Sequence, residues 1–148
     1  MTTLPRLREE VEDLQNKRFK AVQQTFTGGT HGSVLVCQDS TLVRKVAIKR
    51  ILEDDDGKCG LAVHAIREIA AYKKLGDHDN ILKVIEVILG TPMVFILECM
   101  DLTLAQGIKN NICDIHMTSY QTQLLKGVEW CHDHHIMHRD IKPHNILL

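Results

Sequence analysis

The sequence predicts an α+β fold, in which a group of strands carries one inserted helix and is followed by a helical region. Three observations predict it. Short β-prone runs are separated by glycine-rich or polar turns, a segment with helical spacing follows the third run, and helical spacing returns after Thr103. Five strands with one helix after the third, then helices, is an α+β order.

The first three strands are predicted at residues 19–27, 33–38 and 45–52. The glycine-rich segment 28–32 and the pair Asp39-Ser40 separate them. Short runs bounded by such turn residues are typical of successive antiparallel strands.

A helix is predicted over residues 61–75, and Gly76 stands where a glycine would end it. The residues expected to follow one another around one face are Ile66, Ile69, Ala70 and Lys73. A separate amphipathic helix is predicted near the N-terminus, over residues 4–17.

Two further strands are predicted at residues 81–89 and 93–98, joined by Gly90-Thr91-Pro92. Beyond Thr103 the chain is expected to be helical. Thr118-x-x-Gln121 has the pattern of a capping box, and the apolar residues behind it are Leu124, Leu125 and Val128.

Composition narrows the class of protein. The chain has 148 residues, 44% of them hydrophobic, and a formal charge of −1, which gives no reason to expect nucleic acid or an anionic membrane as a partner. No apolar stretch is long enough to span a bilayer, and acidic residues near the start are unlike a signal or transit peptide. We therefore expect a soluble intracellular protein whose five cysteines are reduced thiols.

The most specific motif is His138-Arg139-Asp140-Ile141-Lys142-Pro143-His144-Asn145. It matches H-R-D-x-K-x-x-N, and on this string the chain resembles the catalytic loop of protein kinases. The resemblance implies that Asp140 accepts the proton of a substrate hydroxyl, that Lys142 lies near the γ-phosphate of ATP, and that Asn145 binds Mg²⁺. A surface loop with a chance set of polar residues is the competing interpretation.

A second motif lies between the first two predicted strands, as the kinase phosphate loop should. It reads Thr27-x-Gly29-x-x-Gly32-x-Val34, with Thr27 in place of the first glycine and Gly28 one position late. Glycines allow the backbone to approach phosphate oxygens closely. Alone, the motif is weak and favours a simple hairpin turn, and its position upstream of the other motifs favours the phosphate loop.

The third motif is Val46-Ala47-Ile48-Lys49, which resembles the V-A-I-K of the third kinase strand. Strand alternation sends Ala47 and Lys49 to one face, where the small residue would leave room for adenine and the lysine would bind phosphates. Its expected partner is Glu68 in the following helix. Taken alone, Lys49 is better explained as a lysine on a solvated strand face, and Glu68 together with the Asp140 loop favours the kinase interpretation.

Three segments resemble the cyclin-dependent kinases in particular. Ala65-Ile66-Arg67-Glu68-Ile69 resembles the end of their P-S-T-A-I-R-E helix, and Asp79–Lys83 and Leu124–His132 resemble their H-P-N-I-V-K and L-L-x-G-L-x-x-C-H strings. The resemblance runs from about Phe19 to Leu148. It implies a cyclin-type partner bound through the 65–69 helix, a protein substrate, and a location in the cytoplasm or nucleus.

The same alignment implies the rest of the nucleotide site. Leu97 is the gatekeeper, Glu98-Cys99-Met100 is the hinge that binds adenine through its backbone, and Leu147 is the floor of the adenine pocket. The implied organisation is an N-terminal helical extension at 1–18, a kinase small lobe and hinge at 19–100, and part of the large lobe at 101–148.

The C-terminal region is rich in histidine. Cys131, His134, His135 and His138 would share one face of a continuous helix and could bind Zn²⁺. Kinase topology instead ends that helix near His134 and gives His138 a structural role, so we expect no zinc site.

The 148 residues contain no Asp-Phe-Gly after Asn145, which the kinase family places further on to hold Mg²⁺. We therefore expect a kinase cut off after its catalytic loop, with weak nucleotide binding and little phosphoryl transfer on its own. Two functional classes stay open. One is an ATP-dependent Ser/Thr protein kinase, a specificity that Lys142 favours, and the other is a non-catalytic module that binds a cyclin or another partner.

Overall fold

The computed structural model describes residues 18–27, 33–51, 63–90, 93–111 and 116–148. These residues belong to two compact units, one made of residues 1–65 and 84–99 and the other of residues 66–83 and 100–148. The helix expected at 4–17 lies outside the described residues. In those that are described, the predicted α+β class is confirmed.

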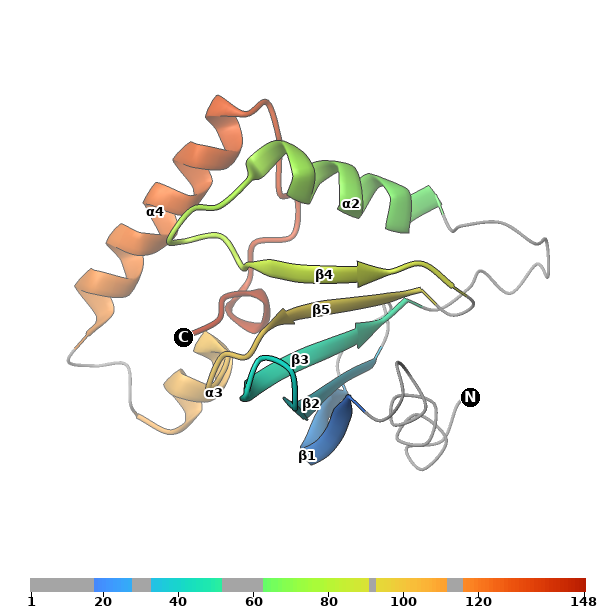
Figure 1. Cartoon of the computed structure of the whole chain (residues 1–148). Coiled ribbons are helices and arrows are strands. Elements are labelled where there is room, and N and C mark those ends of the chain that lie inside the picture. The colour runs from blue at the N-terminus through green and yellow to red at the C-terminus, as the bar shows by residue number, and fades with distance from the viewer. Residues whose placement is uncertain (1–17, 28–32, 52–62, 91–92, 112–115) are drawn as a thin grey trace. The chain divides into compact units, whose positions relative to one another are not determined.

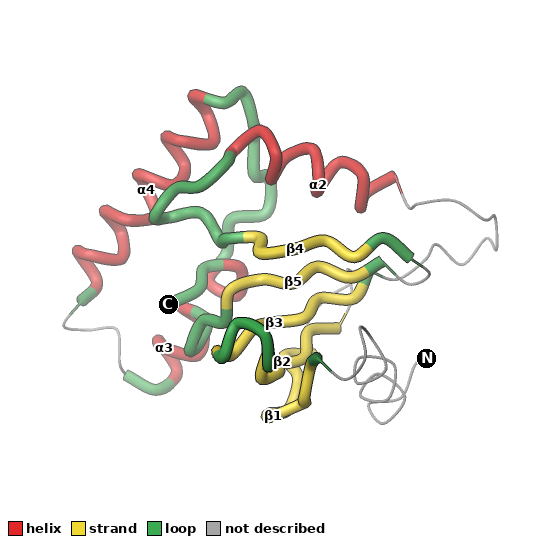
Figure 2. Tube along the Cα trace, in the orientation of Figure 1, coloured by secondary structure: helices red, strands yellow, loops and turns green. Residues whose placement is uncertain are grey.

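The first unit is built on a five-stranded antiparallel sheet with the order β1-β2-β3-β5-β4 (Figures 1 and 2). Its strands are β1 Phe19–Thr27, β2 Ser33–Asp39, β3 Arg44–Arg50, β4 Val84–Ile88 and β5 Val94–Glu98. Each predicted strand is present, with ends shifted by up to three residues. The first four residues of β5 are apolar and buried on both faces of the sheet, whereas β4 forms an edge and is only half-buried.

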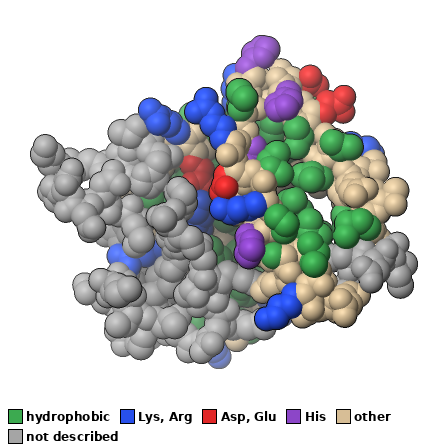
Figure 3. Space-filling view, turned by 180° about the vertical axis from the view of Figure 1, so that it is seen from behind, with side chains coloured by type: hydrophobic (Ala, Val, Ile, Leu, Met, Phe, Trp, Pro, Cys, Tyr) green, Lys and Arg blue, Asp and Glu red, His purple; other side chains and the backbone are tan. Residues whose placement is uncertain are grey.

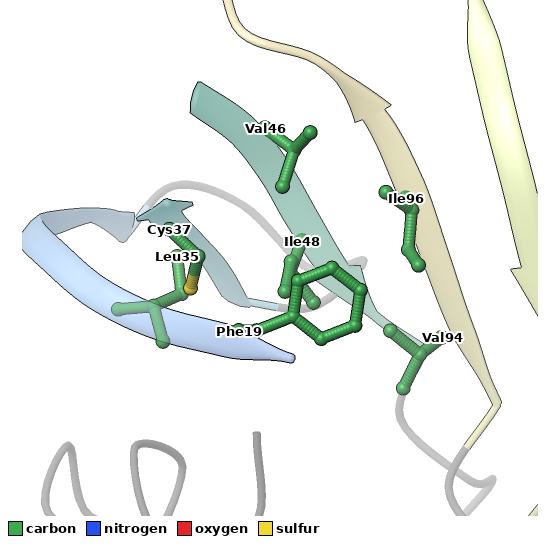
Figure 4. Packing of buried hydrophobic residues seen from close by; sticks show 7 residues of the cluster. All are labelled: Phe19, Leu35, Cys37, Val46, Ile48, Val94 and Ile96. Atoms are coloured by element: carbon green, nitrogen blue, oxygen red, sulfur yellow. The ribbon is translucent and has the colours of Figure 1, made fainter. Parts of the chain in front are cut away.

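Alternation along the strands places the core of this unit on one face of the sheet (Figure 4). The buried cluster consists of Phe19, Leu35, Cys37, Val46, Ile48, Val94 and Ile96. Since successive side chains point to opposite faces, the residues between these positions are left to the other face.

A buried ion pair holds the outer strands together. Asp39 has no exposed surface, and its carboxylate accepts hydrogen bonds from Nε and Nη2 of Arg18, the shortest of them 2.7 Å long. The backbone amides of Thr41 and Leu42 also donate to Asp39 Oδ1. Because Arg18 reaches Glu86 through Nη1 at 2.7 Å, one guanidinium ties β1, the β2–β3 turn and the edge strand β4 to one another.

Helix α2, Val63–Leu75, turns a different face inward from the one expected. Ala65 and Leu75 are buried, and Glu68 and Tyr72 are partly buried, whereas Ile66 is 49% exposed. The predicted face through Ile66 was therefore wrong, because positions 65, 68, 72 and 75 follow the helical repeat more closely. The predicted end at Gly76 is confirmed, with φ of +62° and a hydrogen bond from its amide to the Tyr72 carbonyl.

The second unit contains α3 Leu104–Lys109, α4 Met117–Asp133 and the short 3₁₀ helix η1 Pro143–Asn145. The capping box predicted at Thr118 was wrong, since Thr118 lies inside α4 and His116 is the N-cap without a side-chain cap bond. A capping box forms instead at Thr103 and Gln106, at the start of α3. The same three-residue spacing occurs at both places, and only the position of each helix start decides which one is used.

The loop after α2 packs on α4 within this unit. Trp130 donates from Nε1 to the Leu75 carbonyl at 2.9 Å and stacks on His78, with ring centroids 4.8 Å apart. A Cβ on Gly127 would lie 2.7 Å from the carbonyl oxygen of Asn80, so glycine is required for this approach. The loop is therefore held against α4 both by the close approach of the Asn80 backbone to Gly127 and by the stacking of His78 on Trp130.

Hydrophobic side chains reach the surface of the second unit (Figure 3). Leu125 on α4 and Met137 in the following loop are 68% and 70% exposed. Within the described segments, none of the helices combines the length and the apolarity that crossing a bilayer requires.

Candidate functional site

Four predicted nucleotide residues lie on one face of the sheet in the first unit. Val34 is paired with Lys49, and Ala47 is paired with Leu97. Paired residues of antiparallel strands point to the same side, and alternation joins Ala47 to Lys49. This face is opposite to the buried cluster, so the sheet keeps its core on one side and these four residues on the other.

Lys49 lies above an aromatic ring on this face. Its Nζ is 5.9 Å from the ring centroid of Phe95, its partner across β3 and β5. A cation at this distance is attracted by the ring face, which helps to orient the ammonium group. Phe95 was not predicted, although its position two residues before Leu97 could have indicated it.

The predicted hinge begins at Glu98, the last residue of β5, and the chain after it pairs with the C-terminal residues. Glu98 is paired with Val46, so its side chain lies on the core side of the sheet. In the second unit, Asp101 and Leu102 pair with Leu148, and an isolated bridge joins Thr103 to Leu147. Leu147 is therefore held beside the segment that follows Met100, and its role as the adenine floor stays a prediction.

The catalytic-loop residues form a compact polar cluster in the second unit. Lys142 Nζ lies 2.9 Å from Asp140 Oδ2. Asn145 Nδ2 donates to the same oxygen at 2.8 Å and to the Asp140 carbonyl at 2.9 Å. Two features shape the backbone around them. His138 Nδ1 accepts the Asp140 amide at 3.3 Å, and Arg139 has a φ of +65°, which turns the chain sharply before the aspartate.

The electrostatics of this cluster favour an ionised aspartate. The hydrogen bond from Lys142 lowers the pKa of Asp140, and the hydrogen bond from Asn145 lowers it further. Both side-chain contacts fall on Oδ2. Among the described residues, nothing donates to the other carboxylate oxygen, Oδ1, or to the amide oxygen of Asn145. Two acceptor atoms are thus left available on an exposed surface.

Some predicted site residues are not brought together by the described structure. Glu68 is in the second unit and Lys49 in the first, so their pairing remains a prediction. Gly28, Gly29 and Gly32 of the expected phosphate loop lie outside the described residues. Their segment connects Thr27 and Ser33, which are paired at the ends of β1 and β2.

The histidine-rich segment does not form the continuous helix that a zinc site would need. Helix α4 ends at Asp133 with His134 as its C-cap, and His135 has a φ of +55°. In the part of the chain that the structure describes, no group of three or more His, Cys, Asp or Glu residues is placed to hold a metal ion.

Comparison with known proteins identifies the family. Residues 21–148 match the model of the protein kinase domain. The chain belongs to the protein kinase family.

The chain is similar to several curated kinases. It is 36% identical over 124 residues to "Cyclin-dependent kinase-like 2" of Homo sapiens, covering 81% of this chain and 25% of that protein. It is 36% identical over 129 residues to "Cyclin-dependent kinase 20" of Danio rerio, with 81% and 36% covered, and 35% identical over 133 residues to "Mitogen-activated protein kinase 4" of Homo sapiens, with 81% and 22% covered. The chain thus spans between a fifth and two fifths of the length of these relatives.

Proposed function

We propose that this chain carries the nucleotide-binding sheet and catalytic loop of an ATP-dependent Ser/Thr protein kinase of the cyclin-dependent-kinase-like type. Such an enzyme transfers the γ-phosphate of ATP to Ser or Thr hydroxyls of a protein substrate. The observation that carries the proposal is the cluster of Asp140, Lys142 and Asn145, in which Asp140 is ionised and one of its oxygens is available.

Each member of the cluster has a separate role in this proposal. Asp140 Oδ1 accepts the proton of the substrate hydroxyl, whose oxygen then bonds to the phosphorus while the bond to the ADP oxygen breaks. Lys142 places a positive charge beside the transferred group. The amide oxygen of Asn145 fits a hard cation such as Mg²⁺, which prefers oxygen ligands and neutralises phosphate charge when bound.

The remaining residues hold the nucleotide. Val34, Ala47 and Leu97 offer an apolar sheet face to adenine, with Glu98 and Met100 in the hinge and Leu147 as the floor. The backbone of the phosphate loop, from Thr27 through Gly28, Gly29 and Gly32, covers the phosphates. Lys49 binds the α- and β-phosphates and pairs with Glu68.

Specificity and setting follow from the kinases that the chain resembles. Lys142 two residues after Asp140 favours Ser and Thr over Tyr as acceptors. A cyclin-type regulatory subunit would bind at the 65–69 segment of α2, and the protein would work in the cytoplasm or the nucleus.

Nucleotide binding by the 148-residue chain tests the proposal. We expect weak ATP binding that requires Mg²⁺ and falls about tenfold or more in Lys49→Met, because the phosphates lose their main protein cation. Asn145→Ala should lower the gain in affinity that Mg²⁺ provides, whereas Lys126→Ala on the exposed surface of α4 is the matched control. Calorimetric titration with and without a chelator measures each effect, and equal binding by wild type and Lys49→Met would refute the proposal.

One observation favours the non-catalytic alternative, a module that binds a cyclin or another protein. Ile66 exposes 49% of its surface on α2, beside the exposed Arg67. If the chain acts in this way, Ile66→Ser should weaken capture of a cyclin at least tenfold, while Lys49→Met leaves it unchanged. The two functions are separated because only the kinase proposal requires Mg²⁺-dependent ATP binding.

A further inference from the structure

The region of strands β1 to β3 carries a charge that the rest of the chain does not share. Residues 18–51 contain six Lys or Arg residues and one acidic residue, a formal charge of +5 in a chain whose total is −1. The acidic residue is Asp39, which is buried and paired with Arg18, so it does not offset the cations at the surface. The small net charge of the whole chain therefore hides a strongly basic region.

Three of these cations stand at one end of the sheet. Lys20 and Lys45 lie on one face, because each is paired across the strands with Gln38. Arg44 comes one residue earlier in β3 and therefore points to the opposite face. All three are exposed, and no acidic side chain in the described part of the chain forms an ion pair with them.

The turn between β2 and β3 places apolar side chains beyond these cations. It consists of residues 40–43, in which Val43 exposes 81% of its surface and Leu42 exposes 38%. Val43 has a φ of +53°, a conformation that glycine or asparagine adopts with less strain than a β-branched residue. The fold alone does not require an exposed valine at this strained position, which indicates that its side chain serves a contact.

The backbone donors of this turn are already paired within the protein. Asp39 Oδ1 accepts the amides of Thr41 and Leu42 at 2.8 and 3.1 Å. The Arg18 carbonyl accepts the amide of Ser40 at 3.0 Å and its hydroxyl at 3.1 Å. Paired donors enter a less polar medium at little cost, whereas unpaired donors lose their hydrogen bonds to water.

We propose that the 40–43 turn is a membrane-contact site. Its apolar tip, Leu42 and Val43, enters the headgroup region of an anionic lipid bilayer, and the three cations behind the tip bind the headgroups. Arg44 and Lys45 follow the tip by one or two residues, about 3–7 Å along the strand. This spacing suits a peripheral element that combines shallow apolar burial with attraction to anionic lipid. The site does not depend on the proposed kinase function.

A bilayer fits this surface better than an acidic peptide does. Peptide ligands usually lie in a groove or add a strand to a sheet edge, and the tip of a turn offers neither. Lys45 and Arg44 lie on opposite faces of the sheet, so a compact ligand would contact one and miss the other. A layer of headgroups surrounds an inserted tip and reaches both faces at once.

Sedimentation with lipid vesicles tests the site in the full 148-residue chain. We expect binding to vesicles of phosphatidylcholine and phosphatidylserine in equal parts, and little binding to phosphatidylcholine alone. Arg44→Ala and Lys45→Ala should each weaken binding about fivefold, and added salt should weaken it as well. Lys126→Ala, which removes an exposed cation from α4, is the matched control and should not weaken it.

The apolar tip is tested by a substitution that the backbone tolerates. Glycine suits a φ of +53°, so Val43→Gly should keep or raise the thermal unfolding midpoint while it weakens vesicle binding about threefold to tenfold. Leu125→Ala on α4, where the side chain is 68% exposed, is the apolar control and should bind as wild type does. Undiminished binding by Val43→Gly would refute insertion of the tip.

Other occupants of this surface would give different results. Poly-glutamate is the probe for an acidic polypeptide. If the chain binds it as tightly as the mixed vesicles, and Val43→Gly weakens neither interaction, the partner is an acidic protein and the proposal is wrong. Self-association without lipid that Arg44→Ala abolishes would assign the surface to a second copy of the chain. Absence of wild-type binding to the mixed vesicles would also overturn the proposal.

Discussion

Two aspartates in this chain, Asp39 and Asp140, are each paired with a cationic side chain, and they differ in whether both carboxylate oxygens accept hydrogen bonds. Asp39 is fully buried, and donors from Arg18, Thr41 and Leu42 occupy both of its oxygens. Asp140 is exposed, and its side-chain contacts fall on Oδ2 alone. A saturated buried carboxylate stabilises a fold, whereas a carboxylate with a free acceptor atom remains able to react.

The largest expected effect is at the buried aspartate. Asp39→Asn should lower the free energy of unfolding of the first unit by about 3–5 kcal/mol, because it removes the buried ionic partner of the Arg18 guanidinium and leaves only the half-exposed Glu86. Urea unfolding followed by circular dichroism measures the loss, and hydrogen exchange should locate it in β1–β3. Asp140→Asn is the matched control and should leave the unfolding midpoint where it is. Equal midpoints for the two variants would remove the distinction between these aspartates.

A second change should affect the second unit and leave the sheet unaltered. Gly127→Ala places a Cβ 2.7 Å from the backbone oxygen of Asn80, so we expect a loss of about 1–3 kcal/mol as α4 and the loop move apart. The control is Ala105→Gly on α3, which measures the effect of a simple change in helix propensity. Gly107→Ala would not serve, because Gly107 is buried. Loss of exchange protection in the sheet rather than in α4 would contradict this expectation.

The capping boxes provide a smaller effect. Thr103→Ala should destabilise the second unit by about 1 kcal/mol, since the hydroxyl accepts the Gln106 amide. Thr118→Ala should have a smaller effect, because Thr118 lies inside α4, where alanine is a good helix former. Thermal unfolding of both variants measures the difference, and a larger loss at Thr118 would restore the sequence-based prediction.

The smallest expected effect is a titration shift at Asp140. Lys142→Ala should raise the pKa of Asp140 toward its ordinary value, and Asn145→Ala should raise it less, in the order of their contributions. The carboxyl ¹³C shift followed against pH measures both, with Lys126→Ala as the control. If the titration midpoint of Asp140 is the same in wild type and in Lys142→Ala, the 2.9 Å contact between the two side chains does not persist in solution.

Acid pH should separate the two aspartates further. Arg18 lowers the pKa of Asp39 in the folded chain, so the stability that Asp39 provides is present above its unfolded pKa and disappears as pH falls through the lower folded value. The pKa of Asp140 is also lowered in the folded chain, so its contribution to stability depends on pH in the same direction. This contribution is smaller because Asp140 is exposed to solvent. The sheet should therefore lose exchange protection with acid even in Asp140→Asn.

The sequence predicted local features well and distant ones poorly. The strands followed from alternation and turn residues, the end of α2 from Gly76, and the spacing from Asp140 to Asn145 from a contiguous motif. The link from Arg18 to Asp39 and Glu86 was not predictable, because it joins residues that are far apart in the chain. Strand order had the same difficulty, since the position of β5 between β3 and β4 depends on tertiary pairing.

The errors in the sequence interpretation have physical causes. Thr103 and Thr118 each precede a glutamine by three residues, and pattern alone cannot tell which threonine stands at a helix start. The inward face of α2 was misjudged because Tyr72 and Glu68 were not counted as partly buried. Their spacing of four residues was visible in the sequence, and it would have indicated that both lie on one face of the helix.

The position of Trp130 makes the chain suitable for optical experiments. It is the single tryptophan, and the two tyrosines, Tyr72 and Tyr120, lie in the same unit. Intrinsic fluorescence will therefore report mainly on the second, helical unit and change little when only the sheet unfolds. His78 and His134 flank the indole at 4.8 and 4.2 Å between centroids, close enough for protonated imidazole to quench it. Emission intensity thus gives a label-free signal for the packing of the loop after α2 against α4.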